Sequence, residues 1–209
     1  MKSLFVDTTD HFSIGLLSSD WCWIDYTYST EIKSSAGKIH SLIHNLLEKH
    51  DLVMTDIKRI FFLNGPGSYT GVRVSEGMAQ VFSWLSLETF SFYHHDVPKL
   101  IGTKKGHFVT PAFKKEFFSF SWDGEKEKQE LVGEEGLENF IKSNDLMDCP
   151  YYFIKPGPLK SIETNSEAVY TTDLIKKFSK EIFPKVFEKR LRREPFYFRS
   201  LEKEFKPSY

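Results

Sequence analysis

The chain has 209 residues, with little cysteine, no long apolar run and almost no net charge. Its two cysteines, Cys22 and Cys149, stand far apart without a C-x-x-C pair, which favours reduced thiols over a disulfide framework or a zinc site. No apolar stretch approaches the roughly 20 residues of a membrane span. Asp7 and Asp10 interrupt the N-terminus before a signal-peptide core could form. We therefore expect a cytoplasmic protein that makes no use of a membrane.

The charges are balanced, with 28 basic and 29 acidic side chains. Global charge therefore provides no long-range attraction for nucleic acid or acidic lipid. One local basic run, KVFEKRLRRE at residues 185–194, holds five basic residues against two acidic ones. Such runs are typical of the solvated face of a helix, and we predict a C-terminal helix here. Contact with a tRNA backbone is the alternative.

The apolar patterns predict an α/β protein, and 40% hydrophobic and 16% aromatic residues suffice for a substantial core. β-rich runs, of which the first three indicate an antiparallel meander, occur at residues 3–9, 12–19, 21–30, 58–63, 89–93, 107–112 and 116–122. Helical periodicity occurs at residues 38–50 and 72–85. The charged residues 123–130 are interpreted as a hairpin loop. Because strands followed by helices occur twice, we predict two related lobes, at residues 1–100 and 101–209.

The segment NGPGSYTGVRV, residues 64–74, looks like a phosphate loop because it joins a strand to a helix. A P-loop needs a lysine after its last glycine, and none lies between Asn64 and Gln80. The dinucleotide fingerprint G-x-G-x-x-G fails as well, because Thr70 stands where the third glycine belongs. The glycines permit positive φ, and Ser68 or Thr70 can cap the helix. We favour a tight packed turn, with an anion at the helix N-terminus as the alternative.

No residue pattern indicates a catalytic group. Ser68 lies in G-P-G-S-Y and not in the G-x-S-x-G elbow of a serine hydrolase. His40 and His44 are one helical turn apart, but they lie at the rim of the apolar stripe and lack a third ligand. We therefore predict solvated or interface histidines and no metal site. Asp7, at the end of the first strand, is expected either to cap that strand end or to contact a nucleotide weakly.

Residues 64–74 closely resemble the G-P-G-S-[FY]-T-G-[LV]-R-[IV] motif of the TsaB (YeaZ) family. FVDTTDHFSIGLL, residues 5–17, resembles the N-terminal opening of that family, and EPFYFR, residues 194–199, resembles an element near its C-terminus. The resemblance implies the two-lobed actin-like ATPase fold, which is the ASKHA or ribonuclease H-like fold.

The resemblance also implies a function. TsaB proteins are non-catalytic scaffold subunits that pair with TsaD, and the ATPase TsaE joins the assembly. TsaD transfers a threonylcarbamoyl group onto the adenosine beside the anticodon of ANN-decoding tRNAs. The implied partners are therefore a TsaD-like protein and a TsaE-like ATPase, with tRNA reached through the complex and a homodimer formed by the chain alone. No cofactor would be required, and weak ATP or ADP binding would occur mainly in the complex.

Two alternatives stay open at this point. One is a nucleotide-dependent actin-like enzyme, and the other is an orphan interaction protein on the same fold. Two departures from the family pattern weigh against catalysis. The metal pair of the paralogue TsaD is broken, because His94 stands at its first position but Pro98 at its second. The second lobe begins with PAFKKEFF, residues 111–118, where an aspartate is usual, so we expect no ATP hydrolysis.

The resemblance implies the following contact residues. Weak nucleotide or anion contact is expected at Asp7, Thr8, Thr9, Gly67, Ser68 and Thr70. In this family the two helices of the first lobe pack against the equivalent helices of TsaD. A partner interface is therefore expected at Ile39, His40, Ile43, His44, Leu47, Arg73, Glu76, Gly77, Gln80 and Trp84.

Overall fold

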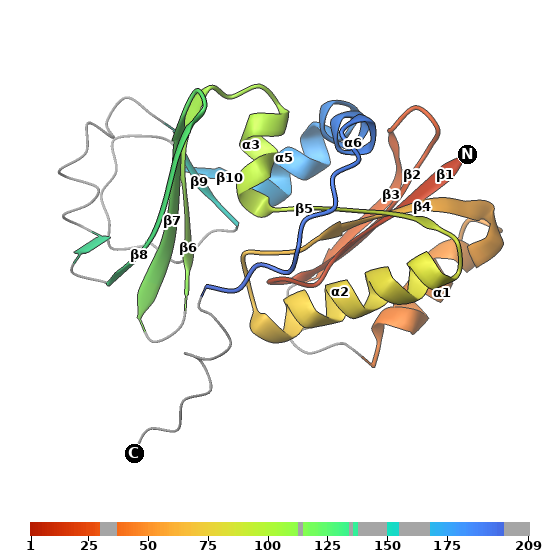
Figure 1. Cartoon of the computed structure of the whole chain (residues 1–209). Helices are drawn as coiled ribbons and strands as arrows, with labels where there is room; N and C mark the ends of the chain where they lie inside the picture. The colour runs from red at the N-terminus through yellow and green to blue at the C-terminus, as the bar shows by residue number, and fades with distance from the viewer. Residues whose placement is uncertain (30–36, 113–114, 134–135, 138–149, 155–167, 199–209) are drawn as a thin grey trace, which may run out of the picture.

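The computed structural model describes residues 1–29, 37–112, 115–133, 136–137, 150–154 and 168–198. Within these residues the chain forms two five-stranded mixed sheets, and helices cover both faces of the first sheet (Figure 1). None of the described helices is long and apolar enough to cross a membrane.

The first sheet has the strand order β3-β2-β1-β4-β5. Its strands are β1 (Lys2–Asp7), β2 (Phe12–Leu17), β3 (Trp23–Ser29), β4 (Ile57–Leu63) and β5 (Glu88–Phe92). The first three strands form the predicted antiparallel meander, whereas β4 and β5 run parallel to β1. Parallel strands need crossover connections, and these contain α1 (Ile39–Glu48), the 3-10 helix η1 (Met54–Asp56) and α2 (Tyr69–Trp84).

The second sheet has the order β10-β9-β6-β7-β8, in which the strands pair in the same pattern as in the first. Its strands are β6 (Lys105–Pro111), β7 (Glu116–Asp123), β8 (Lys126–Gly133), β9 (Tyr151–Phe153) and β10 (Ala168–Tyr170). The hairpin-loop interpretation of residues 123–130 is wrong for most of that segment, because β7 ends at Asp123 and β8 begins at Lys126. The strand β8 lies at the sheet edge, where charged side chains face water and discourage pairing with other chains.

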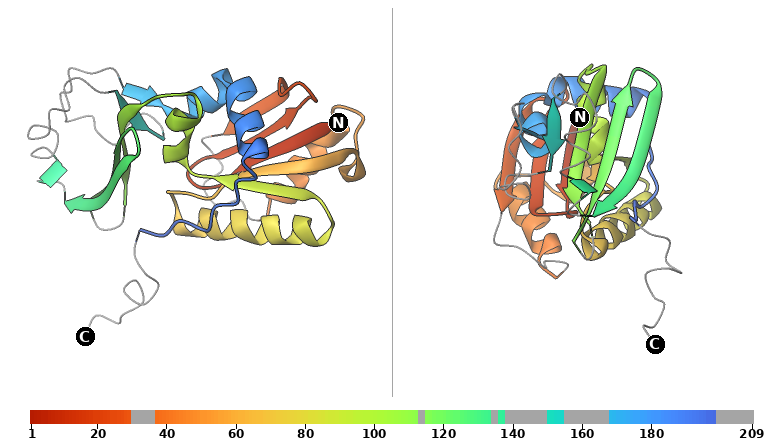
Figure 2. Two further views of the ribbon diagram at one scale, coloured as in Figure 1. Left: turned by 45° about the horizontal axis from the view of Figure 1, so that its top comes forward. Right: turned by 90° about the vertical axis from the view of Figure 1, so that its left-hand side faces the viewer.

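Successive side chains of each strand point to opposite faces of the first sheet, so two separate cores form. Leu4, Val6 and Phe62 pack against the buried side chains of α1 and α2. Phe5 and Phe61 point to the other face, where they pack on Phe183 of a central helix within a core that extends to the second sheet. The central helices are η2 (His94–Asp96), α3 (Val97–Leu100), α5 (Thr171–Lys177) and α6 (Ser179–Glu188). Figure 2 shows α3 and α5 between the two sheets and α6 over the first sheet.

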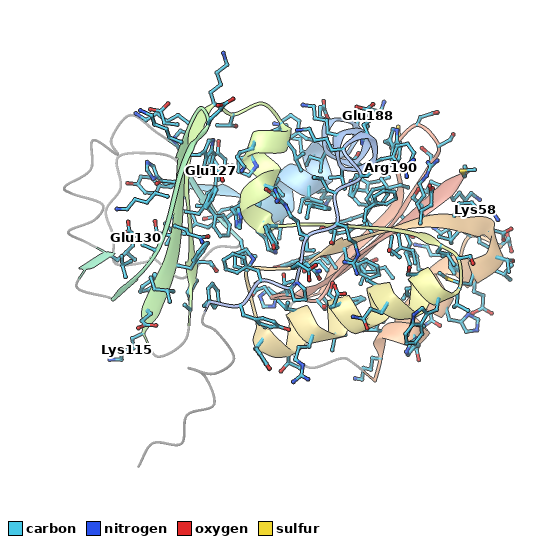
Figure 3. All side chains as sticks on the ribbon, viewed as in Figure 1. Lys58, Lys115, Glu127, Glu130, Glu188 and Arg190 are labelled. Carbon is cyan, nitrogen blue, oxygen red and sulfur yellow. The ribbon has the colours of Figure 1, made fainter. Side chains whose placement is uncertain are left out.

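The basic run at residues 185–194 is not the solvated face of one helix. Helix α6 ends at Glu188, and Arg190 has a positive φ of 48° that turns the chain back (Figure 3). Leu191 packs on the core of the central helices, and the chain then continues in extended form beside β5, where Arg192 bridges Ser91. The apolar Leu191 inside the basic run thus packs on the core and places the following residues beside the sheet.

Candidate functional site

The glycine segment forms a close-packed turn between β4 and α2. Ser68 is the N-cap of α2, and its hydroxyl accepts a hydrogen bond from the Gly71 N–H at 3.4 Å. The Ser68 N–H donates to the Thr9 carbonyl, and the Thr8 hydroxyl donates to the Gly71 carbonyl at 2.6 Å. A Cβ on Gly67 would come within 3.0 Å of the Thr9 carbonyl oxygen, and one on Gly71 would overlap the Thr8 carbonyl oxygen. The glycines therefore let the start of α2 rest on the β1–β2 turn.

This packing determines what the start of α2 can bind. A backbone carbonyl, that of Thr9, already accepts from the helix N-terminus at Ser68, where an anion would otherwise sit. The side chains of Ser68 and Thr70 are exposed, whereas Asp7 and Thr9 are buried at 2% and 0% exposure. The six residues expected to contact a nucleotide thus surround one turn, but most of their polar groups are engaged within the protein. The geometry supports the packed-turn interpretation of the glycines.

Behind this turn, a buried chain of hydrogen bonds links the two lobes. One carboxylate oxygen of Asp7 accepts from the Thr9 N–H at 2.8 Å and from the Thr9 hydroxyl at 2.7 Å. His94 Nε2 lies 2.9 Å from that hydroxyl oxygen, and His94 Nδ1 lies 2.9 Å from the hydroxyl of Thr171 at the start of α5. Because the Thr9 hydroxyl donates to Asp7, it accepts from His94. His94 therefore carries its proton on Nε2, and Nδ1 accepts from Thr171.

Burial determines the charges in this chain of hydrogen bonds. It raises the pKa of Asp7 to about 7, although the hydrogen bonds from Thr9 act in the opposite direction. Burial, together with the neighbouring His95, lowers the pKa of His94 to about 3, so the imidazole is neutral at pH 7. His94 was expected at the first position of a broken metal pair, and here both of its ring nitrogens are paired with threonine hydroxyls. Within the described ranges, no three His, Cys, Asp or Glu side chains gather as metal ligands would.

His95 lies in an aromatic box between the lobes. Its ring stacks on Phe120 with centroids 4.3 Å apart, and it also contacts Phe108, Phe118 and Phe196. Its Nδ1 atom is buried without a hydrogen-bond partner. Burial lowers the pKa of His95 to about 3, with Lys99 and Arg193 acting in the same direction and Asp96 in the opposite one. The box therefore requires a neutral ring.

We predict that His95→Phe reduces the acid sensitivity of folding. As the pH falls below 6.5, the unfolded chain binds a proton at His95, while the folded chain does not until about pH 3. Stability conferred by this residue is therefore lost on acidification, by up to about 1.4 kcal/mol per pH unit in that window. Urea unfolding at several pH values should show the advantage of the variant growing as the pH falls. The exposed His40, changed to Gln, is the control, and equal pH profiles for all three proteins would contradict the prediction.

The structure narrows the expected partner surface on α1. Ile39, Ile43 and Leu47 are 2%, 5% and 4% exposed, because they fill the core between α1 and the first sheet. The prediction that these three residues contact a partner is therefore wrong, because they belong to the core. His40 and His44 lie on the exposed side of α1.

On α2 the exposed positions form one continuous surface. Arg73, Gly77, Gln80 and Trp84 recur at three- and four-residue spacing and are all exposed. Val81 and Leu85 are 46% and 61% exposed, and Trp84 is 80% exposed. Although both are apolar, Val81 and Leu85 lie outside the buried stripe that contains Met78 and Phe82. We name this surface the α2 face, and its residues are Arg73, Gly77, Gln80, Val81, Trp84 and Leu85.

Glu76 does not belong to the α2 face. Its carboxylate forms a two-bond pair with the Arg192 guanidinium, at 2.9 and 3.1 Å, and accepts from Asn64 at 2.9 Å. Arg193 forms a similar pair with the carboxylate of Asp96, at 3.0 and 3.1 Å. Two arginines of the basic run are therefore held by carboxylates of the same chain, which weakens the tRNA-contact alternative.

Comparison with known proteins agrees with these features. The family model "TsaD: tRNA N6-adenosine threonylcarbamoyltransferase" matches residues 31–90, a range that contains both α1 and α2. The tRNA threonylcarbamoyladenosine biosynthesis protein TsaB of Bacillus subtilis (strain 168) is 34% identical over 86 residues, which cover 40% of this chain and 37% of the relative. The match thus spans little more than a third of that relative's length.

Two solved structures from Pseudomonas aeruginosa resemble nearly the whole chain. YeaZ has a TM-score of 0.61 at 15% identity and covers 92% of this chain and 99% of its own. A protein described as similar to peptidase YeaZ has a TM-score of 0.65 at 15% identity, with 93% and 99% covered. At these identities the likeness shows a shared fold, and the sequence matches to TsaB and to the TsaD family model each cover only part of the chain.

The predicted two-lobed actin-like fold is confirmed for this chain. The ethanolamine utilization protein EutJ from Carboxydothermus hydrogenoformans also shares the fold, with a TM-score of 0.53 at 11% identity over 87% of this chain and 89% of its own. The structural likeness covers both lobes, whereas the sequence matches cover less than half of the chain.

Proposed function

We propose that this chain is a non-catalytic subunit of the machinery that makes threonylcarbamoyladenosine in tRNA. It would act by pairing with a TsaD-like protein through the α2 face and the exposed side of α1, and a TsaE-like ATPase would join the pair. The name of the Bacillus subtilis relative supports the pathway. The match of residues 31–90 to the TsaD family model supports an origin shared with the proposed partner.

The observation that carries the proposal is the exposure of apolar side chains on α2. Trp84, Leu85 and Val81 are 80%, 61% and 46% exposed, although each would gain free energy by leaving water. Clustered exposed apolar residues mark interaction sites, and tryptophan is among the residues that contribute most to binding. Gly77 lies on the same face with nothing within 4 Å of an added Cβ, so a partner helix can approach the backbone closely.

The region between the lobes supports a non-catalytic role. Asp7, the residue expected to contact a nucleotide, is buried, and its hydrogen bonds come from Thr9. His94 is 0% exposed and fills the position between Thr9 and Thr171. A nucleotide at this place would first have to displace these side chains and open the lobes. We therefore expect no ATP turnover by the chain alone, and substantial turnover would favour the nucleotide-dependent enzyme instead.

The test is size-exclusion chromatography with light scattering. The chain, the TsaD-like protein of its own organism and their mixture are measured separately, and the mixture is repeated with the TsaE-like ATPase. We expect a mixed species with the summed mass of the two chains, and the sample of the chain alone reports whether it forms a homodimer. If the folded proteins elute unmixed with and without the ATPase, the proposal is wrong and the orphan interaction protein is favoured.

A further inference from the structure

Residues 191–198, which we name the C-terminal strap, run beside β5 and above α2 (Figure 1). The Ser91 N–H donates to the Leu191 carbonyl at 3.0 Å, and the Arg193 N–H donates to the Ser91 carbonyl at 3.2 Å. Further along, the Phe196 N–H donates to the Asn64 carbonyl at 2.9 Å. The strap therefore adds a short parallel segment to the edge of the first sheet, with Ser91 and Arg192 as the bridging residues.

The first anchor of the strap is the carboxylate of Glu76 on α2. Each of its oxygens accepts two hydrogen bonds. Oε1 accepts from Arg192 and from the Gln80 amide, and Oε2 accepts from Arg192 and from the Asn64 amide. Burial opposes ionisation of Glu76, but these hydrogen bonds outweigh it and hold the pKa below the ordinary value. The pair is therefore charged at pH 7 and ties the strap to the middle of α2.

Two further contacts hold the strap, one at η2 of the first lobe and one at the second sheet. Arg193 pairs with Asp96 and lies over the ring of Tyr93, 5.3 Å from its centroid. The ring of Phe196 packs edge-on against Phe118 of β7 in the second sheet, with centroids 4.9 Å apart. One extended segment thus contacts α2, β5, η2 and the second sheet.

We propose that the C-terminal strap is a positioning element that holds α2 in place and keeps the α2 face competent for its partner. The side chains of Arg192 and Arg193 are 36% and 42% exposed. The backbone of the strap pairs with β5 through the β-bridge between Ser91 and Arg192. Solvent-accessible ion pairs are weakened by salt and contribute modestly each, so the strap can open without global unfolding. The statement about the α2 face rests on the proposed function, whereas the statement about the strap does not.

Hydrogen exchange on the full chain tests the strap by itself. In Arg192→Ala, the amides of Arg193 and Phe196 should exchange at least about tenfold faster, because local opening becomes easier. Arg190→Ala is the matched control, since Arg190 is an exposed arginine just before the strap (Figure 3). Glu76→Gln should have an effect similar to that of Arg192→Ala, and the double variant should be no worse than either single one, because both remove the same pair. Unchanged exchange in Arg192→Ala would overturn the proposal.

Affinity for the TsaD-like protein tests the link to the α2 face. We expect Arg192→Ala to weaken pairing at least about fivefold without altering any residue of the α2 face, and Arg190→Ala to leave it unchanged. Faster exchange with unchanged affinity would overturn the link, because the strap would then open without affecting the partner surface. If the unaltered chain does not pair at all, the proposed function fails, while the exchange experiment still decides whether the strap holds α2.

Discussion

Gly71→Ala is expected to destabilise the protein by about 3 kcal/mol or more, which is a large share of the total stability of an ordinary domain. The added Cβ would overlap the Thr8 carbonyl oxygen, and it would also lie 3.1 Å from the Thr9 Cα. Both neighbours are backbone atoms that cannot rotate away, so α2 would have to move off the β1–β2 turn. Urea unfolding at pH 7.5 should show a strongly lowered midpoint or a chain that is already unfolded.

Gly77→Ala is the control for this prediction, because Gly77 lies in the same helix. Nothing lies within 4 Å of a Cβ at Gly77, so alanine there should be neutral or stabilise by about 0.5–1 kcal/mol through helix propensity. If the glycines instead served phosphate approach, Gly71→Ala would remain as stable as the unaltered protein and lose only ligand binding. Equal midpoints for Gly71→Ala and the unaltered protein would therefore refute the packing role.

Gly77→Arg is expected to abolish pairing with the TsaD-like protein while the chain stays folded. The arginine would project from the middle of the α2 face, where a partner helix has to approach, and its charge would be buried on binding. We expect at least about a hundredfold loss of affinity by titration calorimetry. Trp84→Ala should also weaken pairing, by about 2 kcal/mol or more, as truncation of a central aromatic residue commonly does.

Gly133→Arg provides the matched control, because it introduces the same side chain at a glycine with equally open surroundings. Gly133 ends β8 in the second lobe, and nothing lies within 4 Å of a Cβ there. Both arginine variants should keep the thermal unfolding temperature of the unaltered protein. Normal pairing by a folded Gly77→Arg protein, or equal losses in both variants, would show that the α2 face is not the partner surface.

The order and type of the elements in the first lobe could be predicted from local pattern. The helix predicted at residues 38–50 is α1 (Ile39–Glu48), and that predicted at residues 72–85 is α2 (Tyr69–Trp84). The second helix begins earlier than expected because Ser68 caps it within the turn. Period and capping are properties of neighbouring residues, so they are visible in the sequence. The charged residues of β8 misled the prediction, because an exposed edge strand and a loop have similar composition.

The site depended more on contacts between distant residues. The family resemblance placed Glu76 at a partner interface, and only the fold brings Arg192 beside it, 116 residues away. The sequence likewise placed His94 only at the first position of a broken metal pair, and the fold alone brings Thr9 and Thr171 to its two ring nitrogens. No local pattern encodes such pairs, because each partner is chosen by the packing of separate elements.

The sequence by itself determined the glycine turn, the amphipathic helices and the resemblance to the TsaB family, since these depend on residues close to one another along the chain. The tertiary structure alone decided which side of α2 faces water, what occupies the start of that helix and where the basic run lies. The physical reason is that apolar and charged residues each have several partners of suitable chemistry. Only the packing of the two lobes and the C-terminal strap selects among those partners.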